Sequence, residues 1–365
     1  MADDYGYHID HHGSLVRPAS LLAARAAGLS GDALDAATDE AVVTLAHELR
    51  RLTLNAISDG EFRRAYRESV IHDRVAGFAP VAGPTPLADL AEISTARVRS
   101  IPDPSTLAAT GRLAQAETAP VLAAVDRSVF VTLPSPGYLA GAGSAFASAA
   151  DMDRVRAAGA ALAAILRDEI AALSADGVMY VALENPLYAP LLTVNGRAAA
   201  AAAGIDVPAA LVALIEADRT VFSGLAVPAD FRVGLDLTDS GPLPTTASGY
   251  DTTAVAAFLD ETPFPRLSID YPADPAARFP VELVKPGIVV SLGAVNVATP
   301  AIEIVDEILE RLDPIAEERG DADIAVATNG GFAQVADRPL MTAAEQHAKL
   351  QLVEVVARYY WGNEI

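Results

Sequence analysis

Eight short runs rich in β-forming residues alternate with longer stretches rich in Ala and Leu along the 365-residue chain. Between the runs, for example over 151–174 and 298–319, apolar residues recur at three- and four-residue spacing, which is typical of amphipathic helices. Strands that alternate with helices predict a parallel sheet, and eight such units are the number in a (β/α)8 TIM barrel. The runs are His8–Ser14, Asn55–Glu61, Ser128–Pro136, Val178–Asn185, Phe231–Thr238, Arg266–Tyr271, Ile288–Asn296 and Asp323–Asn329.

The second connection, 62–127, is too long for one helix and is interrupted by several prolines. Because proline cannot continue a helix or donate within a sheet, we predict an insertion of loops over about 65–127, with a hairpin near 91–101 and a helix from about Ser105. Thr342 and Glu345 have the spacing of a capping box and predict a last helix that runs to about Tyr360. The sequence contains no repeat and no linker, so we expect a single α/β domain over residues 1–365.

The charge balance restricts the partners of the protein. It has 26 basic and 48 acidic side chains and a net charge of −22, whereas phosphate-rich surfaces are bound through clustered Lys and Arg. We therefore expect a small-molecule substrate, and neither nucleic acid nor a membrane. With no long uncharged apolar stretch and no basic leader in the sequence, a soluble cytoplasmic protein is expected; a homodimer is left open. The absence of cysteine excludes disulfides, thiolate nucleophiles and cysteine-ligated zinc.

Polar side chains end almost every predicted strand. Since the carboxyl ends of barrel strands form the active site, we expect these side chains to meet there. Carboxylates in such a place are costly to bury unless a cation, an ammonium group or a proton accompanies them. For any single residue the alternative is a helix cap or a loop position. The residues are His11, His12, Gly13, Ser14, Asp59, Gly60, Glu61, Ser135, Glu184, Asn185, Asp236, Thr238, Asp239, Asp270, Tyr271, Asn296 and Asn329.

Several stretches resemble, in the same order, short proteins similar to the catalytic C-terminal half of cobalamin-independent methionine synthase. Asp10–Pro18 resembles the DHVGSLLRP opening of that family, Ile57–Arg64 its TDGEFRR element and Leu133–Pro136 its PSP turn. The resemblance continues through Gly249–Asp251, Asn329–Ala333 and the terminal stretch, so that it spans about residues 8–362. It implies a TIM barrel that transfers a methyl group from 5-methyltetrahydrofolate to a thiol activated by zinc.

The positions of the family's zinc ligands differ in this chain. The family has a His and a Cys in an HxC element, a Glu after the next strand and a Cys in a CGFA element. Here those positions are Asp236, Thr238, Asp270 and Gly330. Two carboxylates and a hydroxyl are a poor set for tetrahedral zinc; they suit a harder ion such as magnesium better, and we expect no metal at all. The His of the family's HSP-like element is also missing from Asn296–Pro300.

The resemblance also implies a set of substrate-binding residues. Ser14, Glu61 and Glu184 match the positions that hold the amino-acid acceptor, and an ammonium group between the two glutamates would neutralise both. As catalytic groups we take Glu184 and either Asp236 or Asp270, with one aspartate as general base because its neighbour raises its pKa. The remaining predicted substrate contacts are Arg17, Asn185, Tyr271, Asn296 and Asn329, and the predicted folate contacts are Ser135 and Thr238.

The leading hypothesis is therefore zinc-independent methyl transfer, linked to 5-methyltetrahydrofolate, with an amino-acid-like or other small polar acceptor. The alternative is a folate-independent lyase or isomerase that uses the same carboxylates; only the first should bind a reduced folate. A binding protein without catalysis is a third reading, and the retained carboxylates argue against it. His8, Asp10 and His12 alternate along the first run and suggest a metal hydrolase, but the other histidines fall in predicted helices or loops.

Overall fold

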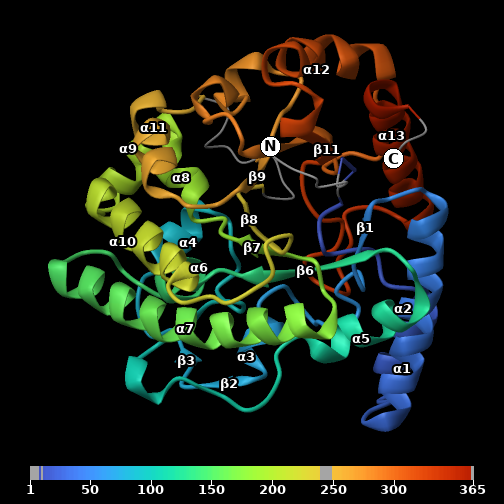
Figure 1. Cartoon of the computed structure of the whole chain (residues 1–365). Helices are drawn as coiled ribbons and strands as arrows, with labels where there is room; N and C mark the ends of the chain where they lie inside the picture. Colours follow the sequence, from blue (N-terminus) through green and yellow to red (C-terminus); the bar gives the residue numbers. More distant parts are fainter. Residues whose placement is uncertain (1–7, 10, 239–248, 363–365) are drawn as a thin grey trace.

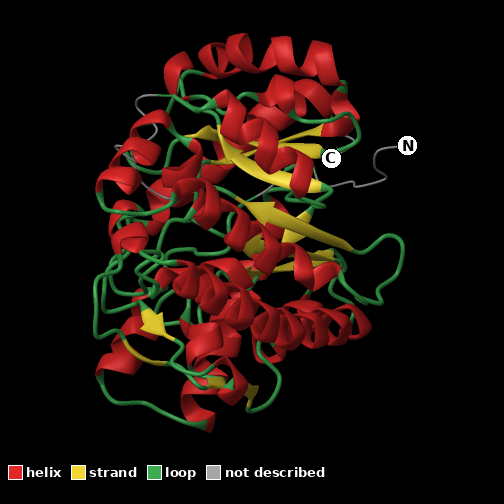
Figure 2. Ribbon diagram, turned by 90° about the vertical axis from the view of Figure 1, so that its left-hand side faces the viewer, coloured by secondary structure: helices red, strands yellow, loops and turns green. Residues whose placement is uncertain are grey.

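A curled sheet of seven parallel strands forms the centre of the molecule, in the order β1-β6-β7-β8-β9-β10-β11. Helices pack around the outside of this sheet (Figures 1 and 2). The computed structural model describes residues 8–9, 11–238 and 249–362; Asp10 and Asp239 lie outside the described residues. Seven of the eight predicted runs are confirmed as strands, which are β1 (Ala56–Ile57), β6 (Ser128–Pro134), β7 (Tyr180–Glu184), β8 (Arg232–Asp236), β9 (Arg266–Asp270), β10 (Val289–Val295) and β11 (Ile324–Thr328).

The first predicted run forms a single parallel bridge instead of a regular strand. Ile9 pairs with Val326 of β11, and the backbone N–H of Val326 donates to the carbonyl of His8 at 2.9 Å. On its other side the N–H of Ile9 donates to Oδ1 of Asn55, just before β1, at 3.2 Å. The N-terminal segment therefore lies between the two edges of the sheet. The parallel, barrel-like sheet is confirmed, whereas an eighth regular strand is not found in the part of the chain that the structure describes.

Local signals explain where the long helices begin and end. The helix α7 begins after Ser148, whose hydroxyl accepts a hydrogen bond from the N–H of Asp151, and ends at Gly177, which has a φ of +103°. The predicted capping box of Thr342 and Glu345 is confirmed at the start of α13. The α-helices are α1 (Ala19–Ala26), α2 (Asp32–Arg51), α3 (Ser69–His72), α4 (Pro86–Leu90), α5 (Gln115–Ala124), α6 (Pro136–Ala142), α7 (Ala149–Asp176), α8 (Tyr188–Leu192), α9 (Val194–Ala202), α10 (Val207–Arg219), α11 (Thr252–Glu261), α12 (Val305–Arg319) and α13 (Ala343–Trp361).

The insertion after β1 differs from the prediction. Two short antiparallel pairs join segments that are far apart in sequence: β2 (Val75–Ala76) with β5 (Ala108–Ala109), and β3 (Ala79–Pro80) with β4 (Arg99–Ser100). The predicted hairpin at 91–101 is therefore wrong. The predicted helix from Ser105 is also wrong, because only a 3-10 turn forms there and α5 begins at Gln115. Strands of two residues are too short to leave a periodic pattern in the sequence.

Alternation along the strands decides which side chains reach the inside of the curled sheet. In β7, Val181 and Leu183 belong to the large core under the outer helices, whereas Tyr180 and Ala182 form a small cluster with Phe130. Because side chains alternate along a strand, the next residue on the face of Tyr180 and Ala182 is Glu184, the last of the strand. The strand thus positions a carboxylate at the carboxyl end of the sheet, on its inner face.

Among the described residues, no single helix has both the length and the apolarity that a membrane crossing requires. The helix α9 and the segment Val207–Phe222 meet those two criteria only as a pair, and they are bent by 108° relative to each other.

Candidate active site

Four buried titratable side chains meet at the carboxyl ends of the strands. Glu184 and Asp236 are the last residues of β7 and β8, Glu61 follows β1, and His12 follows the Ile9 bridge. Their exposed fractions are 4%, 3%, 1% and 6% in that order. The predicted convergence of strand-end residues is thus confirmed for these positions, and their charges must be balanced locally because water does not reach them.

A tight turn aims Glu61 into the site. Glu61 has a φ of +59°, which is uncommon for a residue other than glycine, and it follows Gly60 at +67°. The turn is held by Asp59, whose Oδ1 accepts from the N–H of Glu61 at 2.9 Å. Oε1 of Glu61 accepts from the hydroxyl of Thr132 at 2.8 Å and lies 3.3 Å from Arg64, while its buried Oε2 has no hydrogen-bond partner among the described residues.

Glu184, like Glu61, has one carboxylate oxygen near an arginine and one that no described residue hydrogen-bonds. Its Oε1 lies 3.3 Å from Nε of Arg67, and its buried Oε2 has no hydrogen-bond partner within the described ranges. Burial raises the pKa of Glu184 to about 7; Arg67 opposes the rise, whereas the charges of Glu61 and Asp236 add to it. Burial together with Glu117 likewise raises the pKa of Asp59 to about 7. Burial therefore raises the pKa values of two carboxyl groups in this region toward neutrality.

Asp236 forms an ion pair with His12. Nδ1 of His12 lies 2.7 Å from Oδ2 of Asp236, and Nε2 lies 2.8 Å from the carbonyl oxygen of Thr328. Because a carbonyl and an ionised carboxylate can only accept, this geometry suits an imidazolium with hydrogen on both ring nitrogens. Burial acts to raise the pKa of Asp236, but His12 and Thr238 outweigh it, and the pKa is lowered. The expectation that a neighbouring aspartate raises this pKa is therefore wrong.

Thr238 completes this cluster. Its N–H and its hydroxyl donate to Oδ1 of Asp236 at 2.8 and 2.7 Å. Both carboxylate oxygens of Asp236 are thus engaged by Thr238 and His12. The positions that resemble zinc ligands do not fit zinc: Gly330 has no side chain to offer, and no group of three His, Asp or Glu side chains in the described part of the chain is arranged to hold a metal ion. We therefore derive no chemistry through zinc.

Two glycines allow three chain segments to meet around Ser14 and Glu61. A Cβ at Gly13 would lie 2.6 Å from Oε1 of Glu61 and would overlap the hydroxyl of Thr132. A Cβ at Gly331 would overlap Oγ of Ser14, and the N–H of the next residue, Phe332, donates to the carbonyl of Ser14 at 2.7 Å. Ser14 is buried beside the site, and its predicted contact with substrate stays a prediction.

Arg17 ties together the loops that carry these residues. Its guanidinium donates to the carbonyls of Leu15 at 2.9 Å, Ala333 at 2.6 Å, Glu61 at 2.7 Å and Arg64 at 3.3 Å. Burial lowers the pKa of Arg17 to about 10. With its terminal nitrogens engaged by backbone carbonyls, Arg17 supports the site from behind, and its predicted contact with substrate stays a prediction.

Arg64 and Arg67 come from the same turn and were not predicted as site residues. Arg64 forms a bidentate pair with Glu117, at 2.9 and 2.7 Å, and its NH2 also donates to the carbonyl of Thr132 at 2.6 Å. Although burial acts to lower it, the pKa of Arg64 is raised by Glu117 and Glu61. Arg67 pairs with Glu184. Only their place next to Glu61 in the sequence could have indicated these roles.

Two predicted contacts belong to a separate buried network around Asp218. Nδ2 of Asn185 donates to Oδ2 of Asp218 at 2.9 Å, and so does the hydroxyl of Tyr188 at 2.8 Å. Ser135 caps α6 by accepting from the N–H of Tyr138 at 3.1 Å and also bonds to Asp218. Both Asn185 and Ser135 are completely buried. They hold β6, β7 and α10 together, and their predicted contacts with substrate and folate stay predictions.

The remaining predicted residues lie toward the other edge of the sheet. Asp270 ends β9 and adds to the effect of burial in raising the pKa of Tyr250. Tyr271 packs under the guanidinium of Arg278 at 5.1 Å. Asn296 is exposed, and Oδ1 of Asn329 accepts from the N–H of Val297 at 2.8 Å. Asp270 is not among the charges that shift the pKa of Glu184 most strongly, and the predicted roles of all four residues stay predictions.

His12 was expected among the strand-end side chains of the site, but the sequence indicated no role for it except in a metal hydrolase. The DHVGSLLRP opening has Val where this chain has His12, and the HxC element has His where this chain has Asp236. The structure brings these two departures together in one ion pair. A comparison of these two departures from the family pattern could have indicated that His12 pairs with Asp236.

Comparisons with known proteins agree with this fold. No protein-family model and no curated protein matches the sequence. Among solved structures, the chain is similar to a candidate vitamin-B12 independent methionine synthase from Listeria monocytogenes, with a TM-score of 0.65, 18% identity and 98% of each chain covered. It is also similar to a B12-independent methionine synthase from a Shewanella species, in complex with selenomethionine, with a TM-score of 0.68, 15% identity and 97% of each chain covered. The resemblance seen in the motifs is thus confirmed as a shared fold over nearly the whole chain.

Proposed function

We propose that this protein is a methyl-transfer enzyme that binds the ammonium group of an amino-acid-like substrate between Glu61 and Glu184. 5-Methyltetrahydrofolate is the proposed methyl donor, and zinc takes no part. The observation that carries the proposal is the pair of buried carboxylates, each with one oxygen that no described residue satisfies. The shared fold supports the reaction class, and one of the similar structures is described as a complex with an amino acid.

The electrostatics favour an ammonium group over a neutral ligand. An ammonium supplies three N–H donors and one positive charge, which matches two carboxylate oxygens that lack donors. Without such a ligand, binding a proton removes the buried negative charge of Glu184, whose pKa is about 7. An ammonium ligand replaces that proton, so binding at neutral pH releases protons into the solvent.

Glu184 is also the best placed general base. Before an ammonium group binds, the carboxylate of Glu184, with a pKa of about 7, is a better proton acceptor at neutral pH than Asp236, whose pKa is lowered. Bound 5-methyltetrahydrofolate would supply the methyl group, and Glu184 would take the proton that the acceptor gives up when it is methylated. The imidazolium of His12 contributes a fixed positive charge beside the reacting groups.

Calorimetric titration of the purified protein with L-methionine, and separately with 5-methyltetrahydrofolate, tests the proposal, with metal content measured on the same sample. We expect saturable binding of both, with protons released by L-methionine when buffers of different ionisation enthalpy are compared. Glu61→Gln and Glu184→Gln should each weaken L-methionine binding about tenfold or more, because each leaves a charge-assisted hydrogen bond unmade. Glu310→Gln, on the exposed face of α12, should leave it unchanged. Absence of folate binding would refute folate-linked methyl transfer.

A folate-independent lyase or isomerase is the second candidate. One observation favours it. The pKa of Glu184 is near 7, and the charge of Asp236 helps to raise it. Asp236 in turn is paired with His12. A base and a buried acid so placed can move protons without any cofactor. This function predicts that L-methionine or a related amino acid binds, that reduced folate does not, and that the ligand exchanges a carbon-bound proton with deuterated solvent.

A further inference from the structure

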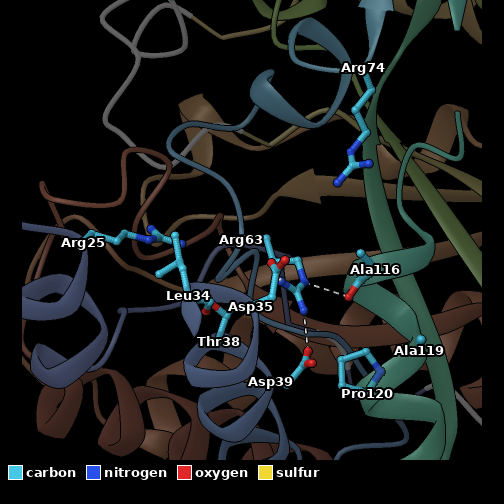
Figure 3. A pocket seen from close by; sticks show the side chains of 10 residues that line it. All are labelled: Arg25, Leu34, Asp35, Thr38, Asp39, Arg63, Arg74, Ala116, Ala119 and Pro120. Atoms are coloured by element: carbon cyan, nitrogen blue, oxygen red, sulfur yellow. Dashed lines mark hydrogen bonds and ion pairs between the residues drawn. The ribbon is translucent and has the colours of Figure 1, made fainter. Parts of the chain in front are cut away.

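A cavity lies on the outer side of the turn that carries Glu61. It has a volume of about 500 Å³, and α2, α5, the end of α1 and the loops at Arg63 and Arg74 form its walls (Figure 3). Arg63 and Arg64 are consecutive but point to opposite sides: Arg64 contacts Glu61 in the candidate active site, whereas Arg63 lines this outer cavity. The function proposed above makes no use of the cavity.

Three guanidinium groups and two carboxylates line this cavity. Both carboxylates form ion pairs with the same guanidinium, that of Arg63. NH1 of Arg63 lies 2.8 Å from Oδ1 of Asp35, and NH2 of Arg63 pairs with Asp39. Nε of Arg63 donates to the carbonyl of Ala116 at 2.8 Å. Figure 3 shows Arg63 in the middle of the cavity with these partners around it. Each nitrogen of the Arg63 guanidinium is thus engaged, and both carboxylates face it.

The other two guanidinium groups have no carboxylate partner among the described residues. Arg25 donates only to the carbonyl of Phe62, and Arg74 only to that of Arg112, at a long 3.4 Å. Arg25 is half-buried, and burial together with the charge of Arg63 lowers its pKa. The wall of the cavity therefore has one excess positive charge and open N–H donors, in a chain whose net charge is −22.

We propose that this cavity binds a small oxyanion through Arg25 and Arg74. Guanidinium forks bind phosphate and carboxylate groups through paired N–H donors, so both kinds of group fit, and the size of the cavity admits a molecule with more than one of them. The anion relieves the repulsion between Arg25 and Arg63, while Asp35 and Asp39 hold Arg63 in place. The ligand class is therefore a small phosphate or polycarboxylate.

Calorimetric titration of the full chain with pyrophosphate, citrate and inorganic phosphate, in a buffer free of other oxyanions, tests this proposal. We expect saturable binding of pyrophosphate, of citrate or of both, and the comparison of the two tells a phosphate ligand from a polycarboxylate. Arg25→Gln and Arg74→Gln should each weaken binding about tenfold, since each removes charge-assisted hydrogen bonds. Asp39→Asn should strengthen it, because it lowers the competing negative charge.

Arg50→Gln is the matched control. Arg50 is an exposed arginine of α2 that pairs with Asp126 outside the cavity, so its loss changes the net charge equally without touching the site. Arg25 and Arg74 each make one bond to a carbonyl, and both variants should keep the thermal unfolding midpoint of the parent. The proposal is wrong if none of the three probes saturates, if Arg50→Gln weakens binding as much as Arg74→Gln, or if Asp39→Asn weakens it. None of these outcomes depends on whether the protein binds an amino acid or a folate.

Discussion

At the scale of single residues, the site contains buried carboxyl groups whose desolvation is not fully compensated by partners inside the protein. Glu184 and Asp59 have pKa values raised to about 7, above their ordinary values of 4.5 and 3.8. A carboxyl group whose pKa is raised by folding binds protons more tightly in the folded state, so stability falls as the pH rises from the unfolded to the folded value. The molecule therefore keeps at this place a destabilising arrangement that a cationic ligand would relieve.

Replacing Glu184 by Gln should stabilise the free protein, and more so at pH 8 than at pH 5. The gain is about 1–3 kcal/mol in the free energy of unfolding at pH 8, because the variant avoids ionising a buried carboxyl group. Urea denaturation at the two pH values measures it. Glu68→Gln is the contrast: the pKa of Glu68 is lowered, with Arg97 and Tyr138 overcoming burial, so this variant should lose stability at neutral pH and lose less in acid. Equal stability of Glu184→Gln and the parent at pH 8 would contradict the first prediction.

The His12–Asp236 pair makes a spectroscopic prediction. Both ring nitrogens of His12 face acceptors, so nitrogen-15 spectra at pH 7.5 should show two protonated nitrogens for this side chain. In Asp236→Asn the carboxylate charge is gone, and a neutral ring with one protonated nitrogen is expected. An unprotonated Nδ1 in the parent protein would show that the pair is not ionic.

At the scale of elements, the site depends on loops that approach each other more closely than side chains normally allow. Gly13→Ala should therefore destabilise the fold by about 1–3 kcal/mol and displace Glu61, since the new methyl group overlaps Thr132. Denaturant unfolding and L-methionine binding measure the two effects. Gly111→Ala is the control, because a Cβ there meets nothing within 4 Å. A Gly13 variant as stable as the control would mean that the loops can separate without loss.

The sequence predicted the strands of the sheet well, and the loops and the insertion less well. Runs such as 178–185 and 323–329 are long and apolar enough to be recognised, and their last residues include Glu184. The role of Arg17 could not be predicted, because its partners are backbone carbonyls in three loops. Every residue has a backbone carbonyl, so the residue types do not show which carbonyls accept a hydrogen bond. The pairing of His12 with Asp236 links positions 224 residues apart, which no local pattern reveals.

At the scale of the whole molecule, an excess of 22 negative charges should make stability depend on salt. Raising NaCl from about 0.01 M to about 1 M shortens the Debye length from about 30 Å to about 3 Å, which screens repulsion between surface carboxylates. The thermal unfolding midpoint should therefore rise across this range. Chloride is preferred to phosphate for the test, because the arginine-lined cavity is proposed to bind oxyanions. A midpoint that falls with NaCl would indicate that attractive ion pairs dominate at the surface.

The bond from Arg17 to Ala333 also bears on the order in which the protein becomes functional during its synthesis. These residues are 316 positions apart, and His12 reaches Thr328 over the same separation. Contacts of such long range close a large loop, so they form late in folding. A ribosome that has not yet released the segment around Thr328–Ala333 carries a chain whose His12 and Arg17 still lack these partners. The candidate site is therefore incomplete until the last strand of the sheet has emerged, however early its first strands are made.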